Sequence, residues 1–357
     1  IMAISADIRI GQESACSIYY NWERAKTMRK YWWRKMWIII LVFVLSVGGS
    51  YSYIRLRQKD FEKEVNASPM DKKLVIPGGM PIGIYLETKG VMVLGTDAIE
   101  REDGVKENPS SHLVKAGDYI QKVNNATVKT KNELIEEMKK LKEEEVVLTI
   151  RRNRENIRIK TKAVRDVKKE YKLGIWVRDN AQGLGTITYL DADSHFGALG
   201  HGIHDVDTNK LLSISKGRVY ATSIRDIQKG KYGTPGGMEG IIVYNNYNIL
   251  GKISENTENG IFGKVERIDT LFTEQKPVET ARKEEIRKGK AKIRCAVEGK
   301  VKEYEVRILE INTKAKEANK GILLEVTDPE LLKVTGGIVQ GMSGSPLLQD
   351  GKIVGAV

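Results

Sequence analysis

The segment Gly341-Met342-Ser343-Gly344-Ser345-Pro346 stands near the end of the sequence and decides how the rest is interpreted. It places a serine inside a glycine-rich turn. Glycines let the backbone turn sharply, so that the serine hydroxyl is exposed and nearby N–H groups face one point. Such N–H groups can hold the oxyanion of a tetrahedral intermediate. The segment therefore predicts Ser343 as a nucleophile, with the N–H groups of Gly341 and Ser343 as its oxyanion hole.

The residues that follow support this interpretation. Residues 347–357 alternate as a strand, an Asp350-Gly351 turn and a second strand, which is the pattern of a hairpin. The alternative is that the serine segment is only a turn between strands, because Ser-Gly pairs are common in turns.

A cluster of histidines offers a general base for the serine. The chain has only four histidines, and His195, His201 and His204 fall within ten residues. His201 lies between two glycines, about 140 residues before the serine. A histidine is the usual partner that takes the proton of a serine nucleophile. His201 is the predicted base, and His195 and His204 remain alternatives.

The composition excludes other classes of function. The net charge is +12, but the basic residues are dispersed. Residues 282–294 hold the densest basic excess, which is more typical of a solvated strand or helix face than of a membrane-binding or polymer-binding surface. No nucleic-acid-binding module is visible. Cys16 and Cys295 lie on opposite sides of a predicted membrane segment, so no disulfide, metal site or cofactor is expected.

An apolar stretch near the N-terminus predicts a transmembrane helix over 36–54. The nineteen uncharged residues between Lys35 and Arg55 span roughly 28 Å as a helix, close to the thickness of a bilayer core. The basic residues that precede them keep the N-terminal segment, 1–35, in the cytoplasm and put the bulk of the chain outside. A signal peptide cleaved near Ser46-Val47-Gly48 is the alternative.

The two ends of the sequence look atypical for an exported protein. A start at Met28 would give a compact basic region before the apolar run, so residues 1–27 are interpreted as a possible artefact. Residues 55–72 are polar and charged and read as a linker. The sequence stops inside a strand at Val357, which suggests that the natural C-terminus lies further on.

Residues 73–165 read as short strands followed by one helix. Thr130-Lys131-Asn132-Glu133 is a capping box that opens the helix, and a hairpin is expected around Asn153. With the string Ala116 to Asn124, this arrangement resembles a PDZ domain. The resemblance implies that Gly83, Ile84, Tyr85 and Leu86 capture the C-terminus of a peptide. The alternative is a small packing domain that binds nothing.

Residues 166–357 are almost entirely strand-like with glycine turns, which predicts a mainly β domain built as a two-lobed antiparallel barrel. The segments 186–205, 230–240 and 336–357 give a more specific likeness. Together with the order of membrane helix, PDZ domain and peptidase domain, they resemble the stage IV sporulation protein B peptidases of endospore-forming bacteria.

This resemblance implies a chymotrypsin-like fold and carries over to individual residues. Ser343 matches the family's nucleophile, His201 its base, and Asp328 its acidic residue. Asp205 and Asp269 remain alternatives for the group that orients the histidine, because the third member of a chymotrypsin-like triad lies further from the serine in sequence. If Asp205 or Asp269 orients the histidine, Asp328 would instead shape the substrate pocket.

The resemblance also implies a biological role. The chain would be anchored in the inner forespore membrane, act between two membranes, cleave itself, and cleave a membrane-bound regulator of an intramembrane metalloprotease. That cleavage would lead to activation of the late mother-cell sigma factor. A non-catalytic PDZ scaffold and a heat-shock periplasmic peptidase are the alternatives, although in the latter the peptidase domain precedes the PDZ domain.

Overall fold

The computed structural model describes residues 73–357 apart from 142, 143, 316, 318 and 319, together with residues 33, 35–38 and 40–42. Two compact units divide the chain, residues 1–67 and 68–357. The described residues of the first unit are helical. In the part of the chain described here, no helix has the length and apolar character needed to cross a bilayer.

Several expectations fall largely outside the described residues. These are the cytoplasmic segment 1–35 with its questioned start, the transmembrane helix 36–54, and the linker 55–72. They stay predictions.

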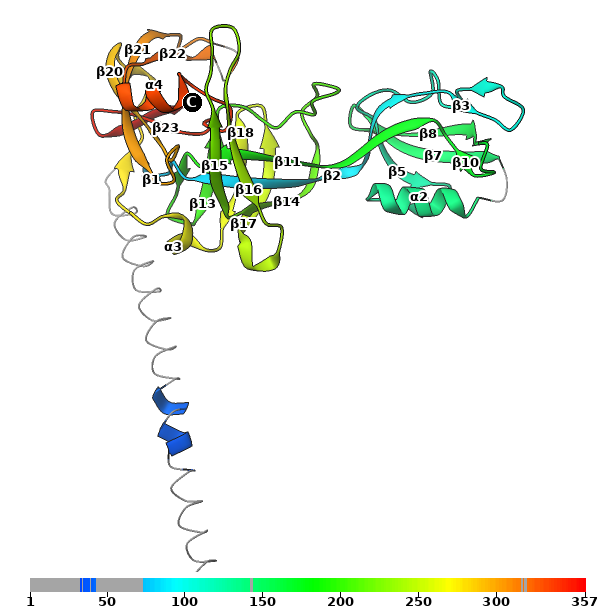
Figure 1. Cartoon of the computed structure of the whole chain (residues 1–357), viewed down its shortest axis with the longest axis horizontal. Coiled ribbons are helices and arrows are strands. Elements are labelled where there is room, and N and C mark those ends of the chain that lie inside the picture. Colours follow the sequence, from blue (N-terminus) through cyan, green and yellow to red (C-terminus); the bar gives the residue numbers. More distant parts are fainter. Residues whose placement is uncertain are drawn as a thin grey trace, which may run out of the picture. The chain divides into compact units, whose positions relative to one another are not determined.

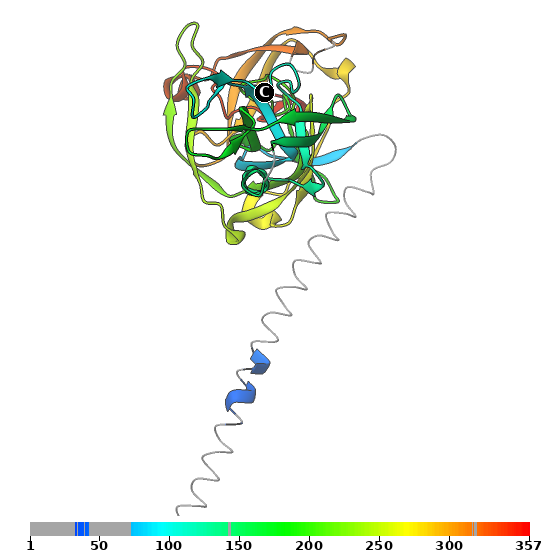
Figure 2. The same cartoon turned by 90° about the vertical axis from the view of Figure 1, so that its right-hand side faces the viewer.

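The second unit is mainly β, as the sequence predicts (Figure 1, Figure 2). Its largest sheet has thirteen strands. Eleven lie along one path, in the order β19 (Val278–Glu279), β1 (Leu74–Pro77), β12 (Tyr189–Leu190), β13 (His195–Leu199), β18 (Gly260–Val265), β17 (Ile249–Thr257), β14 (Ile214–Tyr220), β2 (Pro81–Thr96), β5 (Tyr119–Val123), β7 (Glu145–Arg152) and β8 (Glu155–Lys162). Off this path, β11 (Ile175–Thr186) pairs with β2, and β6 (Ala126–Thr127) pairs with β5.

A second sheet holds the strands around the serine turn. Its order is β22 (Ile322–Val326), β21 (Lys302–Ile311), β20 (Gly289–Cys295), β23 (Pro346–Gln349) and β24 (Lys352–Ala356). The hairpin of β23 and β24 turns at Asp350 and Gly351, both at positive φ, and confirms the strand–turn–strand prediction. Met342 is fully buried in the core beneath this sheet, beside α4 (Pro329–Thr335).

The remaining elements are short. Three small ladders join β3 (Ile99–Glu100) with β4 (Lys106–Glu107), β9 (Val164–Arg165) with β10 (Tyr171–Lys172), and β15 (Thr222–Gln228) with β16 (Gly237–Ile242). The helices are α2 (Lys131–Lys139) and α3 (Ile268–Leu271), with 3₁₀ turns at Asn246–Asn248 and Lys283–Glu285.

The strands form open sheets where closed barrels were expected. Among the described residues, one path of paired strands ends at β19 and β8 and the other at β22 and β24. The prediction of a mainly β fold is confirmed, whereas the predicted two-lobed antiparallel barrel does not match this strand pairing.

One group of elements has its own apolar core, and we call residues 91–177 the helix module. Its core includes Val91, Ile120, Leu134 and Leu148, with Ile175 and Val177 packed against it. Thr130 and Glu133 form the predicted capping box at the start of α2. The hairpin of β7 and β8 turns at Asn153, also as predicted.

The boundary of this module differs from the expected domain 73–165. Strand β1 pairs with β12 and β19. In β2, residues 81–87 pair with β11 and residues 83–88 pair with β14. Residues 74–88 therefore belong to the sheet that carries the histidine loop. The helix module instead extends to the first residues of β11, because Leu173, Ile175 and Val177 complete its core. The module is thus inserted between two neighbouring strands of the same sheet, β2 and β11.

Candidate active site

The structure brings Ser343 and His201 together. Strand β13 ends at Leu199 and leads directly into the histidine loop, and Ser343 lies in the turn that leads into β23. The Ser343 Oγ lies 3.1 Å from the Nε2 of His201. This is the distance expected between a nucleophile and the base that takes its proton.

A backbone carbonyl holds the histidine ring. The Nδ1 of His201 lies 2.8 Å from the carbonyl oxygen of Gly202. A carbonyl only accepts, so Nδ1 carries the proton and the lone pair of Nε2 faces Ser343. The carbonyl thereby selects the tautomer that a general base needs, which is the task of the carboxylate in a Ser-His-Asp triad.

The structure places Asp328 away from this pair. Asp328 is the N-cap of α4, and its carboxylate accepts hydrogen bonds from the N–H groups of Glu305, Glu330 and Leu331. Asp328 also lies near the buried Cys295. Burial is the main reason why the pKa of this thiol is raised to about 12, and the negative charge of Asp328 raises it further. The sequence Asp328-Pro329 is a common helix start, with Pro at the first position, and this accounts for the residue structurally.

The two alternative acids are also occupied elsewhere. The Asp205 side chain is fully buried, forms an ion pair with Arg178 and accepts from the N–H groups of Asp207 and Thr208. Asp269 in α3 accepts from the side chain of Gln275. None of the three acids contacts His201 in the described part of the chain.

We therefore expect Asp328→Asn to keep most of the activity. Asparagine caps helices about as well as aspartate, whereas Asp328→Ala should lower the free energy of unfolding by about 1 kcal/mol. Thermal unfolding and kcat/KM of the purified full chain would measure both effects. A loss of about 10⁴-fold in turnover for Asp328→Asn would instead return this residue to the role of histidine orienter.

The serine turn leaves two donors free. The N–H of Met342 donates to Val339 and that of Gly344 to Val357. The N–H groups of Gly341 and Ser343 donate to no acceptor among the described residues. Two such donors beside a serine can hold the oxyanion of an acyl-transfer intermediate, which is the role that the sequence analysis assigned to them.

Two threonines fix the serine turn against the histidine strand. Thr186 donates its N–H to the carbonyl of Ser343 at 3.0 Å and its hydroxyl to that of Gly341 at 2.8 Å. The fully buried Thr188 hydroxyl donates to the carbonyl of Gly344 at 2.7 Å and accepts from the N–H of Leu199 at 2.9 Å. One hydroxyl therefore joins the residue after the nucleophile to a residue two positions before the base. Sequence reasoning missed both threonines, because nothing in the sequence marks them apart from other strand threonines.

Thr188→Val is expected to reduce kcat/KM by about 10–100-fold while the chain still folds. The change removes a hydrogen bond to each of the two catalytic loops, and displacement of a catalytic group by about 1 Å can cost 10²-fold. Thr222→Val is a matched control, because it removes one threonine hydrogen bond, to the carbonyl of Ile241 in another ladder. Should Thr188→Val turn over substrate as fast as Thr222→Val, the loops must be aligned by other contacts.

A cleft of about 310 Å³ opens at the catalytic pair. It is lined by residues of β11 and of the loop after β13, together with His201, His204 and Ser343. Apolar side chains including Ile84, Leu184 and Ile261 share the lining. Such a cleft suits a peptide segment with an apolar side chain.

The other two clustered histidines have different surroundings. His195 is exposed and lies 3.5 Å from Asp191. His204 reaches the carbonyl of Gly202 with Nδ1 and Glu258 with Nε2, at 3.0 and 3.2 Å. Of the three histidines, His201 is the one in contact with Ser343. No group of three or more histidine, cysteine or acidic side chains in the described residues could hold a metal ion.

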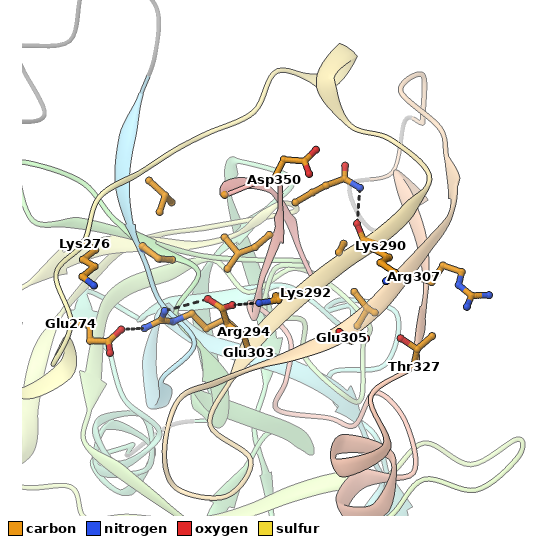
Figure 3. A pocket seen from close by; sticks show the side chains of 17 residues that line it. Glu274, Lys276, Lys290, Lys292, Arg294, Glu303, Glu305, Arg307, Thr327 and Asp350 are labelled. Carbon is orange, nitrogen blue, oxygen red and sulfur yellow. Dashed lines mark hydrogen bonds and ion pairs between the residues drawn. The ribbon is translucent and has the colours of Figure 1, made fainter.

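A larger cavity, of about 680 Å³, lies on β20, β21 and β23 (Figure 3). Charged side chains line it, and Arg294 there pairs with Glu274 and Glu303. Neither Ser343 nor His201 contributes to it. Although this cavity is larger than the cleft at Ser343, it is therefore not the reaction site.

The structure corrects the expected peptide-capture loop. Gly83, Ile84, Tyr85 and Leu86 lie in β2, paired with β11 on one edge and with β14 on the other. Both backbone edges are used, so no peptide can add there. The resemblance at Gly83 to Leu86 was misleading, because these glycine and apolar residues form part of a central strand of the sheet.

The helix module has a groove elsewhere, of about 710 Å³, between α2 and the segment that begins β11. Its floor and walls include Ile135 and Met138 of α2 and Gly174, Ile175 and Trp176. The segment Lys172-Leu173-Gly174-Ile175 borders this groove. A glycine between apolar residues just before a strand is the sequence pattern that would have indicated a peptide-binding loop at this segment.

Comparison with known proteins gives matches of two kinds, to a family profile and to solved structures. The profile described as SpoIVB peptidase S55 matches residues 169–357, a range that contains both His201 and Ser343. Among solved structures, the chain is similar to the PDZ domain of the SdrC-like protein from Listeria monocytogenes, at 22% sequence identity and a TM-score of 0.21. That match covers 25% of this chain and 86% of the other. No curated protein matches the chain.

Proposed function

The chain belongs to the SpoIVB peptidase S55 family and is a serine peptidase of sporulation, and from this we propose that it is a signalling endopeptidase that cuts a membrane-bound regulator. The observation that carries the catalytic part is the 3.1 Å contact between Ser343 Oγ and His201 Nε2 beside two unused N–H donors.

The reaction follows from the geometry. His201 Nε2 accepts the hydroxyl proton as Ser343 Oγ attacks the carbonyl carbon of the scissile peptide. The N–H groups of Gly341 and Ser343 hold the oxyanion. His201 then gives its proton to the leaving amine, and the acyl-enzyme remains. A water molecule, deprotonated by His201, hydrolyses the ester and restores Ser343.

Sequence features support the rest of the proposal. The basic residues before the apolar stretch 36–54 would place the peptidase outside the inner forespore membrane, tethered near membrane-bound substrates. The proposed substrates are a regulator of an intramembrane metalloprotease and the chain itself. Cleavage of the regulator would allow activation of the late mother-cell sigma factor.

The two alternatives are less well supported. A PDZ scaffold without activity would not need a serine and a histidine at reacting distance with free donors beside them. A quality-control peptidase of the heat-shock type carries its PDZ domain after the peptidase domain, whereas the helix module here lies before the histidine and the serine.

A fluorophosphonate probe tests the proposal directly. We expect the purified full chain in detergent to take up the probe at Ser343, located by peptide mapping, and to release fragments of itself and of the co-purified membrane regulator. A chain that remains unlabelled and cuts neither protein would support the scaffold alternative. Expression of the gene in vegetative as well as sporulating cells would argue against the signalling role.

A further inference from the structure

Strand β11 connects the groove of the helix module to the catalytic cleft. Its first residues, Ile175 to Val177, border the groove, and its last, Ala181 to Gly185, line the cleft. Over this whole length its ladder partner among the described strands is β2, on one edge. Figure 1 shows β2 and β11 running side by side between the two regions. The second edge of β11 is therefore free for another strand.

The free edge faces the nucleophile at its far end. Thr186 donates its N–H to the carbonyl of Ser343, so this N–H points away from β2. Successive residues of a strand direct their hydrogen-bonding groups to opposite edges. Leu184 and Gln182 therefore offer their N–H and C=O groups on the same edge as Thr186. A peptide chain pairing with them would pass directly beside Ser343.

The near end of the edge suits a chain terminus. Gly174 has a φ of +62°, and the N–H groups of Leu173 and Gly174 donate to no acceptor in the described part of the chain. Four basic residues line the groove, Lys139, Arg165, Lys169 and Lys172, and three of them pair with acidic side chains, Lys139 with Glu136, Lys169 with Glu102 and Lys172 with Asp166. The attraction for a carboxylate therefore comes first from the free backbone N–H groups.

Helix α2 forms the outer wall of this groove. The N–H of Lys131, at the start of the helix, donates to the Asp179 carboxylate at 2.9 Å. The ladder between β11 and β2 shifts register between Trp176 and Val177 and again between Arg178 and Asn180, where Asp179 has no ladder partner in β2. A strand added to β11 would accordingly form two short ladders, one on each side of Asp179.

We propose that β11 acts as a ruler for cleavage: the C-terminal segment of a substrate adds antiparallel to its free edge, with the terminal carboxylate at Leu173 and Gly174 and the scissile bond at Ser343. The inference rests on the proposed peptidase function and assigns its substrate class, an extended chain with a free C-terminus. An antiparallel chain runs from Thr186 toward Gly174, so its C-terminus lies at Gly174 and a bond upstream of that terminus lies beside the nucleophile.

The length of the strand sets the distance between cut and terminus. Gly174 to Leu184 is a step of ten residues along β11, or roughly 33 Å of extended chain. A paired strand advances at the same rate. The favoured cut should therefore leave a C-terminal product of about ten residues. The irregularity at Asp179 can change this length by about one or two residues.

Nested peptides test the ruler. One internally quenched sequence, chosen from a random peptide library for cleavage by the full chain, is extended on its C-terminal side by Ser/Thr tails of 2, 6, 10 and 14 residues. We expect kcat/KM to be highest for the 10-residue tail, by about tenfold over the 2-residue tail. Amidation of the C-terminus should remove that advantage.

A negative charge in the groove should weaken the dependence of kcat/KM on tail length. Ile135 lines the groove and is 47% exposed, so Ile135→Glu should fold and repel a carboxylate. Val105→Glu is the matched control, because Val105 is 54% exposed and does not line the groove. The ratio of kcat/KM between the 10- and 2-residue tails should fall toward one in Ile135→Glu and remain about tenfold in Val105→Glu.

Failure of the ruler and failure of the proposed function are distinguishable. Cleavage of every peptide at a rate independent of tail length and of amidation would overturn the ruler and leave the peptidase intact. Equal flattening in Ile135→Glu and Val105→Glu would also overturn it, since the effect would not come from the groove. Absence of any cleavage, together with absence of fluorophosphonate labelling, would refute the peptidase itself.

Discussion

Replacing Ser343 with alanine is expected to lower kcat by about 10⁶-fold, to the level that the oxyanion hole and binding alone sustain. The Oγ that forms the acyl-enzyme is lost, and among the described residues the side chain makes no other hydrogen bond than that with His201. His201→Ala should cost about as much, and the double variant should be no slower than either single one, because the two groups act as a unit. Hydrolysis of a library-selected peptide by the purified chain measures all three.

The neighbouring serine provides the control for this result. Ser345 is fully buried, and its hydroxyl has no hydrogen-bond partner in the described part of the chain. Ser345→Ala removes the same atom two positions away, and we expect full fluorophosphonate labelling and unchanged turnover. If Ser343→Ala retained self-cleavage while Ser345→Ala lost it, the nucleophile would have been misassigned.

Gly344→Ala should be the most damaging change that leaves both catalytic side chains in place. Gly344 has a φ of +98°, and a Cβ there would lie 1.9 Å from the carbonyl oxygen of Thr186. The serine turn must then move away from β11. We expect a loss of about 2–4 kcal/mol in the free energy of unfolding, from backbone strain and overlap, and at least about 10²-fold in kcat/KM, from displacement of Ser343.

A second glycine separates strain from overlap. Gly351 also has positive φ, +77°, but a Cβ there would meet nothing within 4 Å. Gly351→Ala should therefore cost about 1–2 kcal/mol of stability and leave kcat/KM unchanged. Denaturant unfolding and peptide hydrolysis would be measured on both variants. Equal kcat/KM in the two would show that the contact between Gly344 and Thr186 does not position the nucleophile.

The candidate site was predictable where short segments carry it. The glycine-rich turn marks Ser343, and a histidine between glycines marks His201, because each motif needs a particular backbone shape that its own residues supply. The capping box of α2 and the hairpin after the serine also depend only on residues close in sequence. The Thr130 side chain accepts a hydrogen bond from the N–H of Glu133, and β23 pairs with β24 across a tight turn.

Residues whose roles depend on distant partners were not predictable. Asp328 stands fifteen residues before the serine and resembles the family's acidic residue, yet its nearest donors belong to the helix that it caps. The Thr188 hydroxyl bonds the N–H of Leu199, and its bond to the carbonyl of Gly344 joins residues more than 150 positions apart along the chain. Sequence spacing does not encode such contacts.

The sequence by itself determined a mainly β chain with a nucleophile turn, a glycine-flanked base and one capped helix, because these depend on alternation of apolar residues and on local backbone shape. Only the tertiary structure decided that the helix module is inserted between β2 and β11, so that Gly83 to Leu86 form a central strand while the free edge of β11 leads to Ser343. The physical reason is strand pairing. Whether an apolar strand has one edge used or both depends on which strands the whole chain brings beside it, and β14, which covers the second edge of β2, begins more than 100 residues later in the sequence.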